Sequence, residues 1–556
     1  MTASALDREY EASFGTVTGP SGRIETALDD QGRIIVTNLP ATLPGLFKMF
    51  CAVNAATEAV VAGDERLSFA DLDRWSDILA HAFVARGLIK GDRLAIAMRN
   101  CPAWIVVYMA AAKAGLVATL LNGWWQIHEL DHALKLTEPK LIVADPARGY
   151  RIADASGDWP VVTLDIDLPI AGAIAPLLDG YGGDHDLPDV APEDPATILF
   201  TSGSTGDSKG AVSTHRAVTT GAYAYATGLM TLLGLLTDDG RAPAEPPRTL
   251  LSVPLFHVTG EVPVMLNSFV VGRCMVVMPK WDAGEALRLI EQERISYFVG
   301  VPTMSLELLR HPNRNQHDLS SLTDIAAGGA ARPVSHVEQL QAAFPGAQPA
   351  LGYGLTETNA VGCSNFWGLY AARPASTGRA QAPFVELAIL GQGERHLPAG
   401  ERGEVAIRSA ANITGYWGNP DATAAAFTAD GYLRTGDVGY LDDEGYLFIV
   451  DRKKDIIIRG GENISAAEVE AACYASPDVI EVAVFAIADE RLGEVPLAVI
   501  HARRGSELDA AGLRAFLDGR LAAFKIPEKI IFAPEPLPRL GTGKIDRVAL
   551  KALHGS

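Results

Sequence analysis

The sequence predicts an α/β protein with a large N-terminal domain of parallel βα units, a β-rich subdomain and a small C-terminal α+β domain. Between residues 46 and 344, apolar runs of strand length alternate with longer segments of helical periodicity, as in parallel βα units. From about residue 384 the pattern changes to short β runs separated by glycine-containing turns. After residue 455 the chain resumes a βαβ style of alternation. With 556 residues, 48% of them hydrophobic, the chain can bury several cores.

The N-terminal region shows the alternation most clearly. Short apolar runs predict strands and longer periodic runs predict helices: strands at 93–98, 140–144, 197–200 and 296–299, and helices at 104–114 and 285–293. Residues 104–125 are apolar enough to test as a membrane span, but Lys113 lies near the middle, where a charge is costly in lipid. We therefore expect a buried helix and turn here, and an exposed loop at the proline-rich residues 238–247.

The second half of the chain is expected to contain shorter elements. Alternating or apolar runs flanked by turn residues predict strands at 386–390, 404–408 and 446–450. Helical patterns follow at 466–474 and 509–522, where the small C-terminal domain is expected.

Composition excludes several functional classes. The formal net charge of −20 makes sequence-independent binding of nucleic acid improbable, because such binding needs a basic face. The five cysteines are scattered and form no C-x-x-C pair, which argues against a disulfide framework or a zinc site and fits a reducing cytoplasm. Residues 1–18 contain acidic side chains and no apolar core of a secretory signal. We expect a cytoplasmic protein without a transmembrane segment.

A glycine- and hydroxyl-rich loop follows the strand predicted at 197–200 and is the most informative segment. Its backbone N–H groups, its hydroxyls and one lysine could hold phosphate oxygens. The residues predicted to bind are Thr201, Ser202, Gly203, Ser204, Thr205, Gly206 and Lys209. An ordinary surface turn is the alternative on composition alone. A nucleotide-hydrolase P-loop does not fit, because the two glycines at 203 and 206 are too close and Gly210 follows the lysine.

The segment at residues 352–358 carries a second set of candidate ligands. Tyr353 could stack on adenine, Thr356 could bond a phosphate, and Glu357 could supply a hard oxygen ligand to Mg²⁺. Gly354 lets the backbone approach a ligand closely. A β-turn with exposed polar residues is the alternative.

Taken together, these motifs resemble those of the adenylate-forming superfamily, which includes acyl-CoA synthetases, luciferases and peptide-synthetase adenylation domains. The loop matches T-S-G-[ST]-T-G-x-P-K-G except that Ser208 replaces the proline, and residues 352–358 match Y-G-x-T-E. Further matches, in the family's order, are residues 254–257, 327–331, 432–437, 451–455 and 538–545. The resemblance covers roughly residues 46–547 and is closest to fatty-acid and aryl-acid CoA ligases.

The resemblance implies a role for each matched residue. Lys544 would be the catalytic lysine, acting with Thr205 and Glu357 at the phosphates and Mg²⁺, and His257 would gate or orient the acid rather than react. Nucleotide contacts would come from Gly329, Ala330, Tyr353, Gly354, Thr356, Asp437 and Arg452, with Asp437 accepting the ribose hydroxyls. Gly460 and Gly461 would line a pantetheine channel, with a turn before a helix N-capped by Ser465 as the alternative.

The resemblance also implies the division of the chain and its motion. Residues 1–450 would form the N-terminal adenylate-forming domain, residues 451–454 a hinge pivoting at Lys454, and residues 455–556 a mobile lid domain that carries the catalytic lysine. Rotation about the hinge would withdraw the lysine and present the glycine-lined face to a thiol.

The implied activity is that of an ATP-dependent carboxylic acid:CoA ligase, AMP-forming, with ATP, Mg²⁺, CoA and a small-molecule acid as its partners. The expected pocket residues carry no Arg or Lys for a second carboxylate: His257, Val258, Thr259, Val301, Gly328, Gly352, Asn359 and Val361. We expect a hydrophobic monocarboxylic acid, a medium- or long-chain fatty acid first and an aryl or alicyclic acid close behind.

Other activities stay open from the sequence. A ligase that loads a carrier protein is the main alternative, a luciferase-like oxidation comes third, and a nucleotide- or acyl-binding regulatory protein is the non-enzyme alternative. The presence of Thr205, Glu357 and Lys544 argues against the regulatory protein. A homodimer also stays open.

Overall fold

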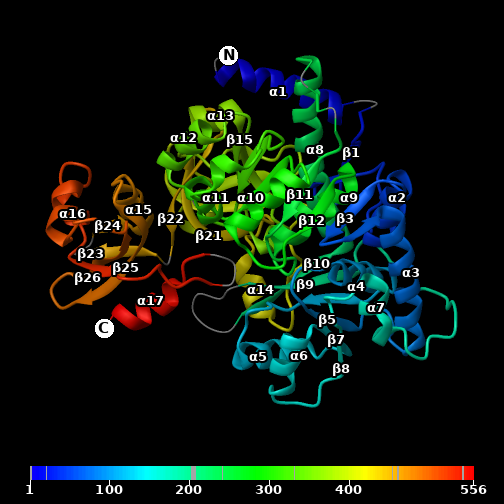
Figure 1. Cartoon of the computed structure of the whole chain (residues 1–556). Helices are drawn as coiled ribbons and strands as arrows, with labels where there is room; N and C mark the ends of the chain where they lie inside the picture. Colours follow the sequence, from blue (N-terminus) through cyan, green and yellow to red (C-terminus); the bar gives the residue numbers. More distant parts are fainter. Residues whose placement is uncertain are drawn as a thin grey trace.

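The computed structural model describes residues 3–19, 22–201, 208–240, 242–243, 245–330, 332–453, 455–459, 462–540 and 544–555. Its N-terminal part contains two large mixed sheets with helices between and around them, and a small C-terminal domain lies to one side (Figure 1). This arrangement confirms the predicted fold class.

The first large sheet carries the loop predicted to bind phosphate. Its strand order is β20-β10-β9-β6-β5-β7-β8. The bounds are β5 (Arg93–Ala97), β6 (Val117–Leu120), β7 (Leu141–Ala144), β8 (Val161–Thr163), β9 (Pro195–Thr201), β10 (Lys209–Thr214) and β20 (Gly415–Tyr416). Strands β5 to β9 are parallel, whereas β10 runs antiparallel to β9 and β20 antiparallel to β10.

Helix α4 (Pro102–Lys113) is buried along its whole length, as the sequence predicted. The Lys113 ammonium lies 2.6 Å from a carboxylate oxygen of both Asp73 and Asp77, so its charge is paired inside the protein. Among the described residues, no helix combines the length and apolar character needed to cross a membrane.

The second large sheet has a parallel centre with antiparallel strands at its edges. Its order is β17-β16-β15-β14-β13-β11-β12-β3-β4. The bounds are β3 (Glu58–Ala62), β4 (Glu65–Ser68), β11 (Arg248–Leu251), β12 (Cys274–Val277), β13 (Tyr297–Gly300), β14 (Asp324–Ala327), β15 (Gln348–Gly354), β16 (Gly362–Phe366) and β17 (Arg379–Ala380).

Neighbouring side chains of a strand point to opposite faces of the sheet, so the clusters that they join show which helices cover each face. Leu250 and Phe298 join one hydrophobic cluster with helices α10 (Ala283–Gln292), α11 (Pro302–Arg310) and α12 (Val334–Ala343). Their neighbours Leu251 and Val299 join another cluster, with α8 (His215–Asp238) and α9 (Asn267–Val271). Helix α8 therefore covers the face opposite to α10 and α11.

The β-rich subdomain is an antiparallel sheet of order β18-β19-β21-β22. Its strands are β18 (Glu386–Leu390), β19 (Gly403–Arg408), β21 (Leu433–Leu441) and β22 (Leu447–Arg452). The chain leaves this sheet at residue 452 and enters the C-terminal sheet at residue 456, close to the predicted hinge. The pivot residue Lys454 lies outside the described residues, so the hinge stays a prediction.

The βαβ style expected after residue 455 is wrong for most of the C-terminal sheet, because most of its strands pair antiparallel. Among the described strands of this sheet, β27 (Lys529–Ala533) alone runs parallel to its neighbour, β26 (Gly493–Ala502). Its other strands are β23 (Ile456–Arg459), β24 (Glu462–Ser465) and β25 (Val479–Asp489), and its helices are α15 (Ala466–Tyr474), α16 (Ala510–Leu517) and α17 (Arg547–His554). The predicted helix at 509–522 is too long. It ends at Leu517 because Asp518 is extended and Gly519 adopts φ +78°, a left-handed conformation that suits glycine.

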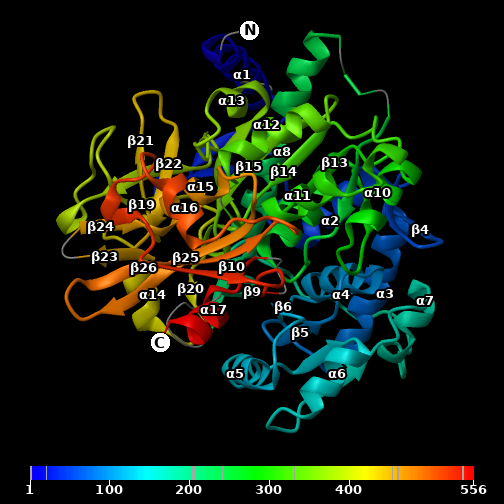
Figure 2. The same ribbon diagram turned by 60° about the vertical axis from the view of Figure 1, so that its left-hand side comes forward.

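An N-terminal helix that the sequence analysis did not predict, α1 (Ala3–Thr18), lies across α8 and beside α13 (Trp367–Ala372) (Figures 1 and 2). Asp7 is buried and accepts a hydrogen bond of 2.8 Å from the Tyr446 hydroxyl, and it lies 3.1 Å from Arg379. The helix therefore connects α8 with the β-rich subdomain.

The C-terminal domain contacts the N-terminal domain through α11 and α12. Arg539 lies 3.3 Å from the Glu307 carboxylate of α11, and the ring of Tyr474 in α15 is 5.8 Å from that of His336 in α12. In this arrangement the segment before α17, drawn in red, reaches back toward β9 and β10 (Figures 1 and 2).

Candidate active site

The predicted phosphate loop connects two antiparallel strands. Thr201, the last residue of β9, pairs with Lys209, the first residue of β10. A nucleotide-hydrolase P-loop instead opens a helix, so this geometry agrees with the exclusion made from spacing. Lys209 is exposed at the mouth of the loop. Five of the predicted ligands lie outside the described residues: Ser202, Gly203, Ser204, Thr205 and Gly206.

Lys209 and Glu357 both contact the side chain of Tyr416, a residue that was not predicted from the sequence. The Lys209 ammonium lies 4.9 Å from the ring centroid of Tyr416, in β20. The Tyr416 hydroxyl donates a hydrogen bond of 2.9 Å to the Glu357 carboxylate, which with burial raises the pKa of Tyr416. Two predicted phosphate and metal ligands, 148 residues apart in the chain, are therefore close together.

The turn that presents Thr356 and Glu357 is held by its neighbours. It is a single 3-10 turn (Thr356–Thr358), after which Asn359 and Ala360 adopt φ +49° and +65° and redirect the chain into β16. The buried Asn359 amide donates to the Ala411 carbonyl (2.7 Å) and to the Ser213 hydroxyl (3.0 Å). These bonds tie the turn to β10 and fix Glu357 beside the phosphate loop.

A glycine is required at residue 354 because the backbone of this turn passes very close to it. A Cβ at Gly354 would lie 2.1 Å from the Ala360 carbonyl oxygen, which no side chain could avoid. The glycine predicted from the motif therefore has a packing role in addition to any nucleotide contact.

Asp437 lies at the centre of the predicted nucleoside site. It is buried in β21, and its carboxylate accepts a hydrogen bond of 2.7 Å from the Tyr353 hydroxyl and lies 2.9 Å from Nε of Arg452. Burial and the Asp437 charge raise the pKa of Tyr353. Strands β15, β21 and β22 thus bring together three residues that the motifs assigned to the nucleotide.

Lys544 reaches this site from the C-terminal domain. A Cβ placed on Gly329, which adopts φ +73°, would lie 3.2 Å from Cε and 3.3 Å from Nζ of Lys544. The lysine therefore lies against the Gly329 backbone at the carboxyl end of β14. Ala330 is the next residue and is exposed beside it.

The charges around Lys544 alter two pKa values. Loss of hydration and the Arg452 guanidinium, partly offset by Asp437, lower the pKa of Lys544 to about 8, although the residue as a whole is exposed to solvent. Burial and the nearby Lys544 charge lower the pKa of His257 to about 3. His257 is therefore neutral at physiological pH, which fits an orienting role better than proton transfer. Its buried Nε2 has no hydrogen-bond partner among the described residues.

Few described atoms lie in front of the two glycines predicted to border the acid. Among the described residues, a Cβ on Gly328 would meet only the Gly352 carbonyl oxygen, at 3.6 Å, and a Cβ on Gly352 only the Tyr225 hydroxyl, at 3.8 Å. The Tyr225 hydroxyl is fixed by a hydrogen bond of 2.7 Å to the Ala360 carbonyl. Tyr225, on α8, was not predicted, because nothing in the local sequence distinguishes it from a core residue.

The residues present fit one Mg²⁺ ion. Within the described ranges, no group of three or more His, Cys, Asp or Glu side chains could enclose a metal. Mg²⁺ is commonly held by one or two carboxylates together with substrate phosphates, and Glu357 beside Lys209 offers that arrangement.

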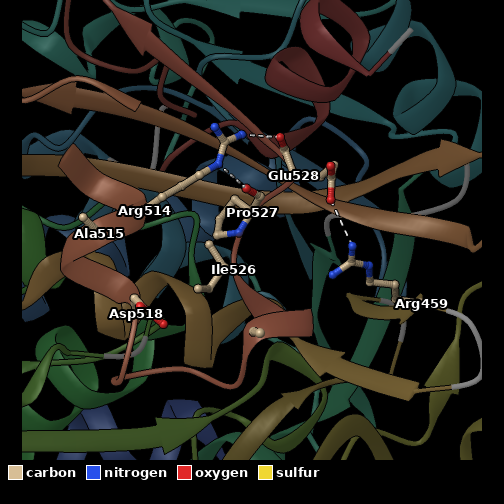
Figure 3. A pocket seen from close by; sticks show the side chains of 8 residues that line it. Arg459, Arg514, Ala515, Asp518, Ile526, Pro527 and Glu528 are labelled. Atoms are coloured by element: carbon tan, nitrogen blue, oxygen red, sulfur yellow. Dashed lines mark hydrogen bonds and ion pairs between the residues drawn. The ribbon is translucent and has the colours of Figure 1, made fainter. Parts of the chain in front are cut away.

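A separate pocket of about 520 Å³ lies on the C-terminal domain between α16 and the start of β27 (Figure 3). Arg459 and Arg514 line it, but each is engaged: Arg459 pairs with Glu528 at 2.9 Å, and Arg514 donates to the Pro527 carbonyl at 3.3 Å. None of the residues assigned to adenylation lines this pocket. Gly460 and Gly461, which follow Arg459, lie outside the described residues.

The fold, in which a lysine of the C-terminal domain lies beside the predicted nucleotide site of the N-terminal domain, is that of an adenylate-forming enzyme. Residues 47–417 match the AMP-binding enzyme family and residues 468–544 its C-terminal domain. The chain belongs to this family and is an AMP-forming acid:CoA ligase, which uses ATP, Mg²⁺ and CoA.

Named relatives cover nearly the whole chain. A feruloyl-CoA synthase from Amycolatopsis sp is 34% identical over 88% of this chain and 94% of its own, and a long-chain-fatty-acid–CoA ligase from Bacillus subtilis is 33% identical over 87% and 89%. The ATP-bound structure of MatB from Rhodopseudomonas palustris matches with a TM-score of 0.81 at 29% identity, over 92% of this chain and 99% of that one.

Proposed function

We propose that the enzyme activates a hydrophobic monocarboxylic acid with a compact aryl or alicyclic body and transfers it to CoA. The observation that carries this proposal is the small number of described atoms in front of Gly328 and Gly352. The fixed hydroxyl of Tyr225 lies at the edge of this region. Loss of hydration raises the pKa of both Tyr225 and Tyr297, although each side chain keeps accessible surface. A raised pKa together with some accessible surface is expected of tyrosines that line an internal cavity, and these two rings would form aromatic walls of the acid pocket.

The proposed acid reverses the order expected from the sequence, which placed fatty acids first and aryl or alicyclic acids close behind. The relatives act on both kinds of acid by name, so they do not choose between them. Flat or bicyclic bodies suit aromatic walls, since aromatic side chains offer large rigid contact areas. A pocket of this kind discriminates single methylenes by only about 1–3 kcal/mol, so we expect a range of ring acids and medium-chain acids to be accepted.

In the first step the acid carboxylate attacks the α-phosphorus of ATP, forming a P–O bond while the bond to pyrophosphate breaks. We propose that Lys544 stabilises the negative charge that develops on the carboxylate and α-phosphate oxygens, as a positioned point charge in a partly desolvated site. Asp437 would accept the ribose hydroxyls in place of its present partner Tyr353 or Arg452. When bound, Mg²⁺ would neutralise phosphate charge beside Glu357.

In the second step the CoA thiol attacks the acyl carbon, the thiol proton is released and AMP leaves. We propose that rotation about residues 451–454 withdraws Lys544 and presents the face that contains Gly460 and Gly461. The pocket beside Arg459 lies on the same domain and would then be available to the rest of CoA (Figure 3). A carrier protein in place of CoA would need no such pocket.

The five cysteines are free and buried, which supports a cytoplasmic location because a reducing compartment keeps thiols unpaired. A homodimer stays a prediction from the sequence.

A panel assay tests the proposed substrate. AMP and pyrophosphate release would be measured with ATP, Mg²⁺ and CoA for aryl, bicyclic and fatty acids of increasing length. The proposal expects kcat/KM to be highest for ring acids and to fall for long-chain acids. A maximum at palmitate length would overturn the aryl or alicyclic assignment.

A further inference from the structure

The N-terminal helix α1 lies outside the region that matches the family, which begins at residue 47, and it packs on α8, the helix that carries Tyr225. We propose that α1, through Tyr10, closes the far end of the acid pocket and sets the longest acid that the enzyme accepts. This inference rests on the proposed function.

Helix α8 forms one wall that leads from the site to Tyr10. It begins at the end of β10 opposite to Lys209, and its contacts with the turn that follows Glu357 place it beside the site. Gly221, Tyr225 and Gly228 are spaced by four and three residues and share one face. A Cβ on Gly221 would contact Asn359, and Tyr225 bonds the Ala360 carbonyl. A Cβ on Gly228 would meet the Tyr10 hydroxyl, at 4.0 Å, and no other side chain in the described part of the protein. From Gly221 to Gly228 the helix rises ~10 Å.

The sheet forms the second wall and leads to the same side chain. Gly352 pairs with Ser364, and two residues farther from the site Ala350 pairs with Phe366. The Tyr10 ring lies 4.8 Å from the ring of Phe366, centroid to centroid. Two residues of a strand span ~7 Å. Tyr10 therefore bridges the sheet and α8 just beyond Tyr225.

Tyr10 is held firmly in this place by the rest of α1. Asp7, one turn earlier, bonds Tyr446 and pairs with Arg379, and the Ser13 hydroxyl donates to the Thr231 carbonyl at 2.9 Å. Loss of hydration raises the pKa of Tyr10 to about 12, and the side chain keeps some accessible surface. The Tyr10 ring is thus held between α8 and the sheet, which form the two walls.

The consequence is a limit on acid length. A ring acid that extends ~7–10 Å beyond Gly352 would reach Tyr10, given the rises of the strand and helix that form the walls. An extended palmitoyl chain is considerably longer and would meet the Tyr10 ring. Gly228 lies directly before that ring, since among the described side chains the Tyr10 hydroxyl alone comes within 4 Å of its Cβ position.

The test compares acid-length profiles of the full-length enzyme and its variants. For straight-chain acids of increasing length, we expect Tyr10→Ala to raise kcat/KM at least tenfold for acids longer than the wild-type limit. Tyr10→Phe keeps the ring and should keep the limit. Gly228→Ala adds one methyl group in a helix interior, where alanine is favoured, and should lower kcat/KM severalfold for the longest accepted acid only. Glu9→Ala, on the exposed side of α1, is the matched control.

The possible results distinguish a failure of the Tyr10 assignment from a failure of the proposed function. If wild-type enzyme releases no AMP with any acid, the proposed function fails. If it is active but Tyr10→Ala and Gly228→Ala both keep the wild-type length profile, the assignment of Tyr10 as the end of the pocket is wrong. Thermal melting of each variant reports whether α1 stays packed, and Gly228→Ala decides the question if Tyr10→Ala does not fold.

Discussion

Lys544 should carry its proton at neutral pH and lose it near pH 8 in the free enzyme. The ordinary pKa of a lysine is 10.5, and loss of hydration together with the Arg452 guanidinium lowers it to about 8. Because the lowered pKa favours the neutral form, raising the pH removes the charge that adenylation requires. With this pKa the lysine is about 91% protonated at pH 7 and about 9% at pH 9, so the rate should fall about tenfold across this interval.

The assay is single-turnover formation of the acyl-adenylate without CoA, with ATP below saturation so that kcat/KM reports the free enzyme. At saturating ATP the alkaline limb should move to higher pH, because the bound phosphates favour the charged lysine. Lys544→Arg keeps a positive charge throughout the range, and its profile should be lower but flat. An alkaline limb that is identical in Lys544→Arg, or absent below pH 10 in the wild type, would refute the reasoning.

Three substitutions test other contacts of the site. Asp437→Ala removes both acceptors for the ribose hydroxyls and should raise KM for ATP tenfold or more in steady-state assays; an unchanged KM would argue against that role. Glu307→Ala breaks the contact with Arg539, which is worth about 0–1 kcal/mol at the surface, so adenylation should slow by at most about fivefold while thioester formation from supplied acyl-adenylate is unaffected. Equal slowing of both steps would contradict a role in docking the lysine domain. Gly354→Ala forces a methyl group against the Ala360 carbonyl and should destabilise the fold by about 1–3 kcal/mol, seen as a lower Tm; an unchanged Tm would contradict the close approach.

Local sequence patterns predicted much of this fold because many of its strands and helices have the hydrophobic periodicity typical of their type. The strands at 93–97 and 141–144 and the buried helix α4 agree with their predicted positions to within a few residues. The phosphate-loop strands and the turn of Glu357 were found because glycine, hydroxyl and carboxylate residues occur together over a few positions.

Features that depend on distant contacts were not predictable in the same way. Tyr416 bonds a carboxylate 59 residues away, and nothing around it resembles a motif. Helix α1 was missed because its stabilising contacts, such as Asp7 with Tyr446, come from far along the chain. The mainly antiparallel C-terminal sheet likewise depends on pairing between β23 and β26, which no local pattern specifies. The ribose role of Asp437 and the hinge at 451–454 stay predictions.

The central claim is that Lys544 serves adenylation and not thioester formation. The most direct measurement compares wild type and Lys544→Ala in two half-reactions: acid-dependent exchange of labelled pyrophosphate into ATP, and conversion of supplied acyl-adenylate to acyl-CoA. We expect the variant to lose exchange by about 10²–10³-fold, the scale for removing one charge-stabilising donor, while acyl-CoA formation stays close to the wild-type rate. Retained exchange, or equal loss of both half-reactions, would contradict it.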